Sequence, residues 1–238
     1  MGLRQNLYNL YILGRYKEKT LSKSMSNSFT TFSSAIAAPK TWLWKGFPIC
    51  YQVVGNTGPA VVLVHGFGAS WGHWRKNLPV LGETCRCYAI DLIGFGGSAK
   101  PTPDVEIDYT FETWGEQVAD FCREVVGGPA FLVGNSIGGD VVLQTAVEEP
   151  DLVLGVALLN CSLRLLHYRR SSLRFWYEHF TTSVVQQYLN DKAIGYFFYE
   201  QITQLITLDG VGHCPHDEAP ELVNPILQNW ILSLSKEN

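Results

Sequence analysis

A serine flanked by glycines stands where a buried strand is followed by a helix. The segment Gly134–Gly139 (GNSIGG) follows an apolar run at 130–134 and precedes a helical stretch at 140–149. In such a context Ser136 is a candidate nucleophile, because small neighbours let the chain turn sharply and lift the hydroxyl above the sheet. The start of the helix adds partial positive charge beside a developing oxyanion. The pattern therefore predicts nucleophilic attack on a carbonyl carbon.

A second glycine-bearing turn, His65–Gly68, ends the apolar run at 60–65. A backbone N–H in such a turn can point at a substrate carbonyl. We therefore expect the amides of Phe67 and Ile137 to form an oxyanion hole. The side chain of His65 is expected to hydrogen-bond the loop, and only the loop backbone is given a part in the reaction.

A histidine late in the chain is the candidate base. His213 follows the short apolar run at 204–208, and the base follows the nucleophile in chain order in this arrangement. His213 would take the proton of Ser136 and return it to the leaving group. His216 lies farther from the strand end, next to acidic residues, and we expect it to be a surface histidine.

Four segments together resemble the α/β-hydrolase superfamily. They are HGFGASWGHWRKN at 65–77, AIDLIGFGGSAKP at 89–101, GNSIGG at 134–139 and GHCPHDEAPELVN at 212–224. They are similar in particular to its plant and cyanobacterial branch, which includes pheophytinase and chlorophyll dephytylase, plastid enzymes that cleave the phytyl ester of chlorophyll pigments. The resemblance runs from Thr41 to Trp230.

The resemblance implies an α/β fold with a mostly parallel central sheet and helices on both faces. It also implies Ser136 as nucleophile, His213 as base and the amides of Phe67 and Ile137 as oxyanion donors. No cofactor and no metal are expected. Asp91 matches a structural position of the family, and we assign it no catalytic role.

The sequence departs from the family at the acid of the triad. The family places a strand and a W-G-x-x-D-P loop after a helical lid, and no such segment follows the lid-like stretch 161–203. We therefore expect a truncated lid, one missing strand, and a gap or an unpaired edge in the sheet. Asp209 and Asp191 are weak candidates for the acid. Asn160 stands where some relatives keep theirs, but an amide carries no charge.

The missing acid lowers the activity that we expect. Removing the charge of the acid costs about 10⁴ in turnover in the serine protease template. A skipped exon or a faulty gene model would account for the missing piece. We expect a serine hydrolase of carboxylic esters, for example a lipophilic ester such as a phytyl ester, acting through an acyl-enzyme with weak or no turnover.

Two other functions remain open. One is a non-catalytic α/β-hydrolase-like binding protein or a non-functional splice form. The other is a cofactor-free lyase or peroxidase-like activity on the same scaffold. Aromatic residues of the lid-like stretch could line an apolar pocket or simply pack a core; they are Phe175, Trp176, Phe197 and Phe198.

Strand-like and helix-like segments alternate along the chain. A β-hairpin is expected at 42–54 around a Lys-Gly turn. Continuous apolar runs typical of buried parallel strands lie at 60–65, 86–91, 130–134 and 153–160, with helical spacing at 109–126 and 140–149. This alternation predicts a parallel sheet covered on both faces.

Composition excludes several functions. The net charge of −4 has no long run of one sign, so nucleic acid binding has no electrostatic basis. No apolar stretch reaches the roughly 20 residues of a membrane helix, and no integral membrane segment is expected. The 6 cysteines are expected to be free thiols in a reducing compartment.

The first 40 residues differ from the domain at 41–238. They hold 6 basic residues against one acid, and 9 of the 15 residues at 20–34 are Ser or Thr. We expect a disordered tail, and its composition is typical of a plastid transit peptide. The alternative is a tail without a targeting signal on a cytoplasmic protein.

Overall fold

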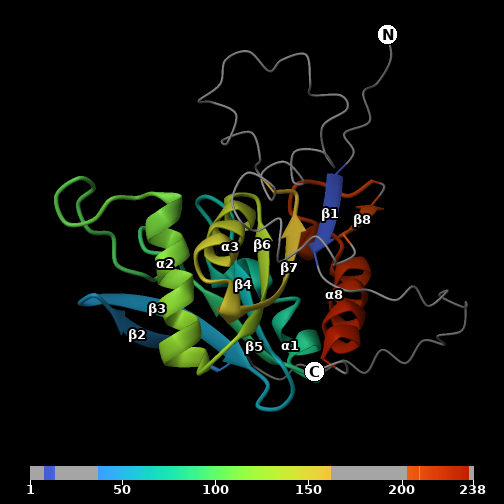
Figure 1. The fold of residues 1–238 in the computed structure, drawn as a ribbon. Helices are drawn as coiled ribbons and strands as arrows, with labels where there is room; N and C mark the ends of the chain where they lie inside the picture. Colours follow the sequence, from blue (N-terminus) through green and yellow to red (C-terminus); the bar gives the residue numbers. More distant parts are fainter. Residues whose placement is uncertain (1–7, 14–36, 162–202, 209, 236–238) are drawn as a thin grey trace, which may run out of the picture.

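One mixed sheet of eight strands carries the fold (Figure 1). The computed structural model describes residues 8–13, 37–161, 203–208 and 210–235. The strands are β1 (Tyr8–Leu13), β2 (Lys40–Trp44), β3 (Phe47–Val54), β4 (Ala60–Val64), β5 (Arg86–Ile90), β6 (Ala130–Asn135), β7 (Val153–Leu159) and β8 (Thr203–Leu208). Their order across the sheet is β2-β3-β5-β4-β6-β7-β1-β8.

The four central strands are parallel and deeply buried. β5, β4, β6 and β7 pair in parallel, and every residue of β4 and β6 is buried. Such continuous burial requires cover on both faces, which is why these strands are apolar throughout and do not alternate. The expected α/β-hydrolase fold with a mostly parallel sheet is therefore confirmed.

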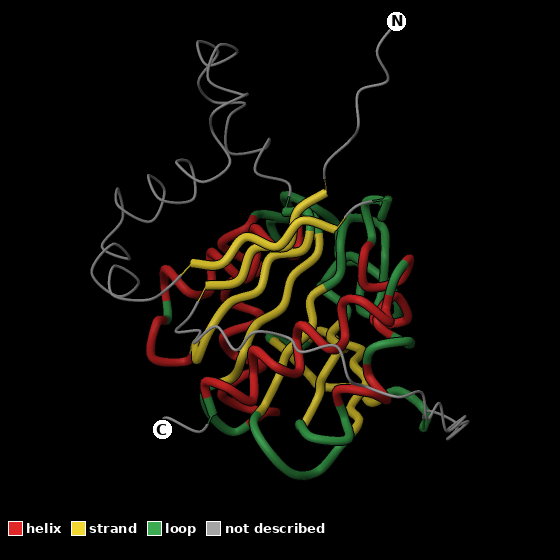
Figure 2. Tube along the Cα trace, turned by 90° about the vertical axis from the view of Figure 1, so that its right-hand side faces the viewer, coloured by secondary structure: helices red, strands yellow, loops and turns green. Residues whose placement is uncertain are grey.

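Helices cover the two faces of the sheet (Figures 1 and 2). The helices are α1 (Leu78–Leu81), α2 (Phe111–Phe121), α3 (Ile137–Glu148), α7 (Pro215–Glu218) and α8 (Pro220–Leu234), with short turns η1 (Trp71–Trp74), η2 (Cys122–Val126) and η3 (Pro150–Leu152). Residues of α2 and α3 join one core cluster, and residues of α1 and α8 join the other. The sheet lies between these two apolar layers.

Local sequence explains the first hairpin and the start of α2. Lys45 and Gly46 both have positive φ, at 48° and 85°, as a two-residue hairpin turn between β2 and β3 requires. The hydroxyl of Thr110 accepts the N–H of Thr113 at 3.1 Å and caps α2. Both elements lie where the sequence predicts them.

Strand β1 occupies the place where the sequence predicts a gap. It pairs antiparallel with β7 on one side, from Leu10↔Leu159 to Leu13↔Val156, and antiparallel with β8 on the other. These six residues belong to the segment 1–40 for which we expect a tail. The expected unpaired edge of β7 is thus covered by a strand from the other end of the sequence.

Other expectations lie outside the described residues. These are the lid-like stretch at 162–202 with its aromatic residues, and most of the expected tail, at 1–7 and 14–36. Within the described ranges, no helix is both long enough and apolar enough to cross a membrane. All six cysteines lie in these ranges, and each is a free thiol.

We predict that deleting residues 1–13 destabilises the protein far more than deleting residues 1–7. Only the longer deletion removes β1, which is the one sheet neighbour of β8 among the described strands. A loss of about 3 kcal/mol would lower the melting temperature by roughly 6–12 °C. Amide hydrogen exchange at Ile206–Leu208 should accelerate in the longer deletion. Equal melting temperatures and equal exchange in the two deletions would refute this role of β1.

Candidate active site

Ser136 adopts a strained backbone conformation at the junction of β6 and α3. Its φ of 55° and ψ of −121° lie outside the regions that residues with a Cβ favour. Close packing of the backbone around it leaves no room for larger neighbours. A Cβ on Gly134 would lie 2.2 Å from the carbonyl oxygen of Gly138, and one on Gly138 would lie 2.4 Å from that of Val64. The glycines therefore permit a turn that presents the serine.

The turn after β4 lies against this serine. A Cβ on Gly66 would be 3.1 Å from the Cβ of Ser136, so the two backbones are in close contact. The N–H of Ile137 is the first of α3 and has no acceptor within the helix. Phe67 follows Gly66 directly. The structure thus brings the two segments expected to form an oxyanion hole to the same edge of the sheet.

His65 is buried and holds the turn. Its Nδ1 lies 2.7 Å from the carbonyl oxygen of Gly66, and its Nε2 accepts the N–H of Leu92 at 3.1 Å. Since Nε2 accepts, the proton is on Nδ1, which donates to Gly66. Burial lowers the pKa of the imidazole, so His65 stays neutral. This is the structural position that the sequence suggests for its side chain.

Asp91 organises the loop after β5. One carboxylate oxygen accepts the N–H of Trp71 and the other accepts the N–H of Gly97 at 2.7 Å. Its own carbonyl oxygen accepts the hydroxyl of Ser98 at 2.7 Å. A Cβ on Gly96 would lie 2.2 Å from the carboxylate, so only glycine fits there. Asp91 therefore stabilises the loops beside the site.

His213 lies in a loop that side chains at the ends of β6 and β7 contact directly. Its carbonyl oxygen accepts a hydrogen bond from Nδ2 of Asn135 and another from Nδ2 of Asn160, both at 3.1 Å. The residue before Ser136 thus contacts the backbone of His213. The imidazole itself is exposed, and within the described ranges it makes no hydrogen bond to the hydroxyl of Ser136. Such bonds are often long before substrate binds.

Glu218 holds the same loop from its other side. Its two carboxylate oxygens accept the N–H groups of Gly212 and Cys214, each at 2.8 Å. A Cβ on Gly212 would lie 2.1 Å from this carboxylate, so a larger residue there would require the Glu218 side chain to move. The sequence reasoning missed Glu218 and Asn135 as parts of the site. A glutamate five residues after the candidate base was the signal for the first.

His216 is fully buried, which corrects the expectation of a surface histidine. Its ring stacks on Trp74 with a centroid distance of 4.0 Å. Neither ring nitrogen has a hydrogen-bond partner in the described part of the chain. Burial lowers the pKa of His216 to about 3, so the ring is neutral. The sequence did not predict this burial, because it results from a tertiary contact with η1.

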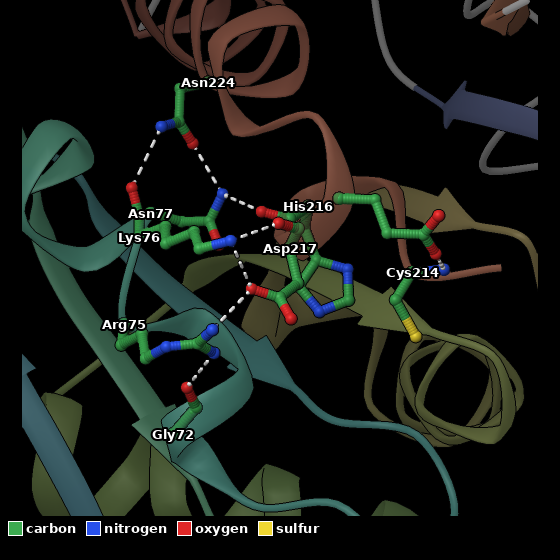
Figure 3. A network of polar contacts seen from close by, with 9 residues as sticks. Gly72, Arg75, Lys76, Asn77, Cys214, His216, Asp217 and Asn224 are labelled. Atoms are coloured by element: carbon green, nitrogen blue, oxygen red, sulfur yellow. Dashed lines mark hydrogen bonds and ion pairs between the residues drawn. The ribbon is translucent and has the colours of Figure 1, made fainter. Parts of the chain in front are cut away.

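A polar network joins this region to the segment after the oxyanion turn (Figure 3). Nδ2 of Asn77 donates to the carbonyl oxygen of His216 at 3.1 Å and to Oδ1 of Asn224 at 2.6 Å. Arg75 and Lys76 form ion pairs with Asp217, at 2.9 and 3.0 Å. Helix α7, which follows the loop of the candidate base, is therefore fixed to the segment at 75–77, and this segment is in turn bonded to Asn224 in α8.

The structure supplies no carboxylate partner for His213 among the described residues. The two acid candidates, Asp209 and Asp191, lie outside those residues. Asp140 is 5% exposed, and Sγ of Cys161 lies 3.3 Å from its Oδ1. Burial raises the pKa of Asp140 to about 7. No cluster of three potential metal-ligating side chains occurs in the described ranges.

A strained serine between β6 and α3, a glycine turn after β4 and a histidine after β8 are thus present in the described part of the chain. The model of the α/β hydrolase fold family matches residues 59–228. The chain therefore belongs to this family.

Several curated relatives match less than half of the chain. Chloroplastic pheophytinase of Arabidopsis thaliana is 33% identical over 132 residues, which cover 44% of this chain and 27% of the relative. Bifunctional epoxide hydrolase 2 of Rattus norvegicus is 36% identical over 45% of this chain and 19% of the relative. Fluoroacetate dehalogenase of a Burkholderia species is 34% identical over 45% of this chain and 36% of the relative. The chain therefore spans only a minor part of each.

Solved structures of similar proteins include a bacterial membrane phospholipase A. It is 32% identical, with a TM-score of 0.47, covering 50% of this chain and 38% of that chain. The epoxide hydrolase CorEH is 29% identical, with a TM-score of 0.45, covering 49% of this chain and 39% of that chain. The family assignment above rests on the family model alone.

We predict that Ser136→Gly is more stable than Ser136→Ala. A residue held at an unfavourable backbone conformation costs about 1–3 kcal/mol, and glycine relieves part of it. Alanine removes the same hydroxyl but keeps the Cβ. The glycine variant should melt about 2–4 °C higher for each kcal/mol gained. Identical melting curves for the two variants would show that the turn is not strained.

We predict that His216 destabilises the protein as the pH falls. Its folded pKa of about 3 lies below the ordinary histidine pKa of 6.5, so the unfolded chain binds the proton first. The contribution to stability is intact above about pH 6.5 and declines by at most about 1.4 kcal/mol per pH unit below it. Thermal melting of wild type and His216→Phe between pH 7 and 4 measures this difference.

The comparison with His216→Phe isolates one group among several. Asp140 acts in the opposite direction, because its raised pKa favours folding as the pH falls from 7. His73, Arg75, Asp217 and His213 also influence the pKa of His216. These groups are common to both proteins. A stability difference that does not change with pH would contradict the prediction.

Proposed function

We propose that this site cleaves carboxylic esters through an acyl-enzyme on Ser136, with His213 as base. The observation that carries the proposal is the positive φ of Ser136 at the start of α3. In that position Ser136 lies at the N-terminus of α3, and its Cβ lies against the turn at Gly66. The amides of Phe67 and Ile137 would then stabilise the oxyanion of the tetrahedral intermediate.

The identity of the nucleophile favours acyl substrates. Attack of a serine oxygen on an ester gives an ester intermediate, which water hydrolyses. Attack on an epoxide or an alkyl halide would give an ether, which water does not cleave under these conditions. We therefore assign this chain to ester chemistry, although relatives named as an epoxide hydrolase and a dehalogenase share its fold family.

The surroundings of the serine favour a lipophilic ester. The side chain of Phe67 is 77% exposed, although it belongs to the turn beside Ser136. Its ring packs edge-on against Phe95 at 5.5 Å, and Phe95 packs on Trp114 at 5.8 Å. An exposed aromatic surface supported in this way offers an apolar contact to a hydrocarbon group of the substrate. A phytyl ester is one such substrate.

We propose that turnover is slow. The reason is that no described carboxylate orients the imidazole of His213. In the serine protease template this loss lowers turnover by about 10⁴, or roughly 5.5 kcal/mol of barrier. A binding protein without catalysis is the second candidate, and the same observation favours it. The chemical test below separates the two.

A plastid location is part of the proposal. The basic, hydroxyl-rich composition of the first 40 residues supports it. The printed name of the Arabidopsis relative, a chloroplastic pheophytinase, supports it as well.

We predict that a fluorophosphonate probe forms a covalent adduct on Ser136. The adduct should be absent in Ser136→Ala and should form more slowly in His213→Gln, because the base no longer accepts the proton. Intact-mass and peptide mass spectrometry locate the adduct. Hydrolysis of a long-chain p-nitrophenyl ester should be detectable but slow, and should depend on Ser136.

The matched control is Ser233→Ala on α8, which leaves every group of the site in place. Its labelling should equal that of the wild type. Folded wild type without any adduct on Ser136 would overturn the enzymatic proposal and identify a binding protein. Fast turnover would refute the proposal of slow turnover and would indicate that residues outside those described supply the acid.

A further inference from the structure

The backbone of the loop at 212–214 is held by side chains from three elements. Its carbonyl groups accept from Asn135, at the end of β6, and from Asn160, just after β7. Its N–H groups donate to Glu218 in α7. A loop held in this way takes its position from those side chains.

Asn160 makes the bridging contact. Its Nδ2 donates to the carbonyl oxygen of Gly212 at 3.0 Å and to that of His213 at 3.1 Å. An amide nitrogen carries two hydrogens, so both bonds can form at once. The backbone of Asn160 has a φ of 47°, in the left-handed region that asparagine tolerates better than most residues. Residue type and backbone conformation thus agree.

Asn135 ties the same loop to the nucleophile. It is 1% exposed, and its Nδ2 donates to the carbonyl oxygens of Leu159 at 3.0 Å and of His213 at 3.1 Å. The N–H of Ser136 donates to the same carbonyl of Leu159 at 3.0 Å. A continuous chain of hydrogen bonds therefore runs from the backbone of Ser136 to the backbone of His213.

We propose that Asn160 and Asn135 form an amide clamp that positions His213 relative to Ser136. The inference rests on the proposed function, since it assigns the clamp to the base of that reaction. Both asparagines are positioning residues, because they contact the backbone of the base and not the substrate. The clamp fixes the loop by hydrogen-bond donors, and a carboxylate at residue 160 cannot replace it.

Two interpretations of residue 160 can be distinguished by the chemistry of its contacts: an amide clamp, or the empty position of the triad acid. An ionised carboxylate only accepts hydrogen bonds, so Asp at residue 160 would face two carbonyl oxygens without a proton to share. It would repel the loop that the amide attracts. If residue 160 were instead the empty place of the triad acid, the same aspartate would supply the missing charge and speed the reaction.

The test compares Asn160→Asp and Asn160→Ala with wild type in the rate of fluorophosphonate labelling. We expect labelling to slow tenfold to a hundredfold in both variants, because small displacements of a base have effects of this size. In Asn160→Asp the two facing carbonyl oxygens should raise the pKa of the new carboxyl, because only its protonated form can donate to them. The defect should therefore grow between pH 5 and 8, as the carboxyl loses that proton. Faster labelling of Asn160→Asp would overturn the clamp.

A purely structural role is excluded by two further measurements. Asn56→Asp, in the exposed turn before β4, makes the same change of charge away from the site and should label like the wild type. The pH profile of labelling should change only in the variants at residue 160. If Asn160→Ala melts lower but labels at the wild-type rate, the contact merely stabilises the fold.

The clamp can also be tested without activity. In NMR spectra of protein with labelled histidine, the ring of His213, assigned with His213→Gln, should show a changed environment in both variants at residue 160. Amide exchange at Gly212 and Cys214 should accelerate at the same time. If wild type fails to label while these changes appear, the proposed function fails and the clamp stands. Unchanged spectra and exchange would refute the clamp itself.

Discussion

The close approach of the β6–α3 turn to the end of β4 is the constraint on which the site depends. Backbone atoms of Gly138 and Val64 come so near that a single added Cβ would overlap them. This contact holds Ser136 in a left-handed conformation and sets the turn at Gly66 against it. The unfavourable backbone geometry persists because two fully buried strands fix its surroundings. The position of the serine is therefore a property of the sheet.

The position of the candidate base depends on weaker and more numerous contacts. β8, which leads to His213, is separated by β7 and β1 from β6, the strand that precedes Ser136, so no direct ladder joins the two strands. Side chains supply the connection instead. Asn135 and Asn160 bind the loop from the side of the serine, and Glu218 binds it from α7. Polar side-chain contacts, and not hydrogen bonds between adjacent strands, therefore hold the His213 loop near Ser136.

Three buried ionisable groups near the site have pKa values that burial shifts. His216 is kept neutral by burial against Trp74, and Asp140 has its pKa raised to about 7. His65, with both ring nitrogens hydrogen-bonded, is neutral as well. Burial therefore disfavours the charged form of each of these three groups.

The sequence by itself determined the first hairpin, the central parallel strands and the elbow at Ser136, because these follow from local periodicity and from glycines that a tight turn demands. The family followed from the resemblance of four motifs. Tertiary structure decided what local patterns cannot encode. His216 is buried because η1 packs on it, and Asn160 serves the base loop because β7 ends beside it. β1 fills the sheet because strand pairing joins residues far apart in the chain. Such long-range contacts leave no period in the sequence, so only the folded chain shows them.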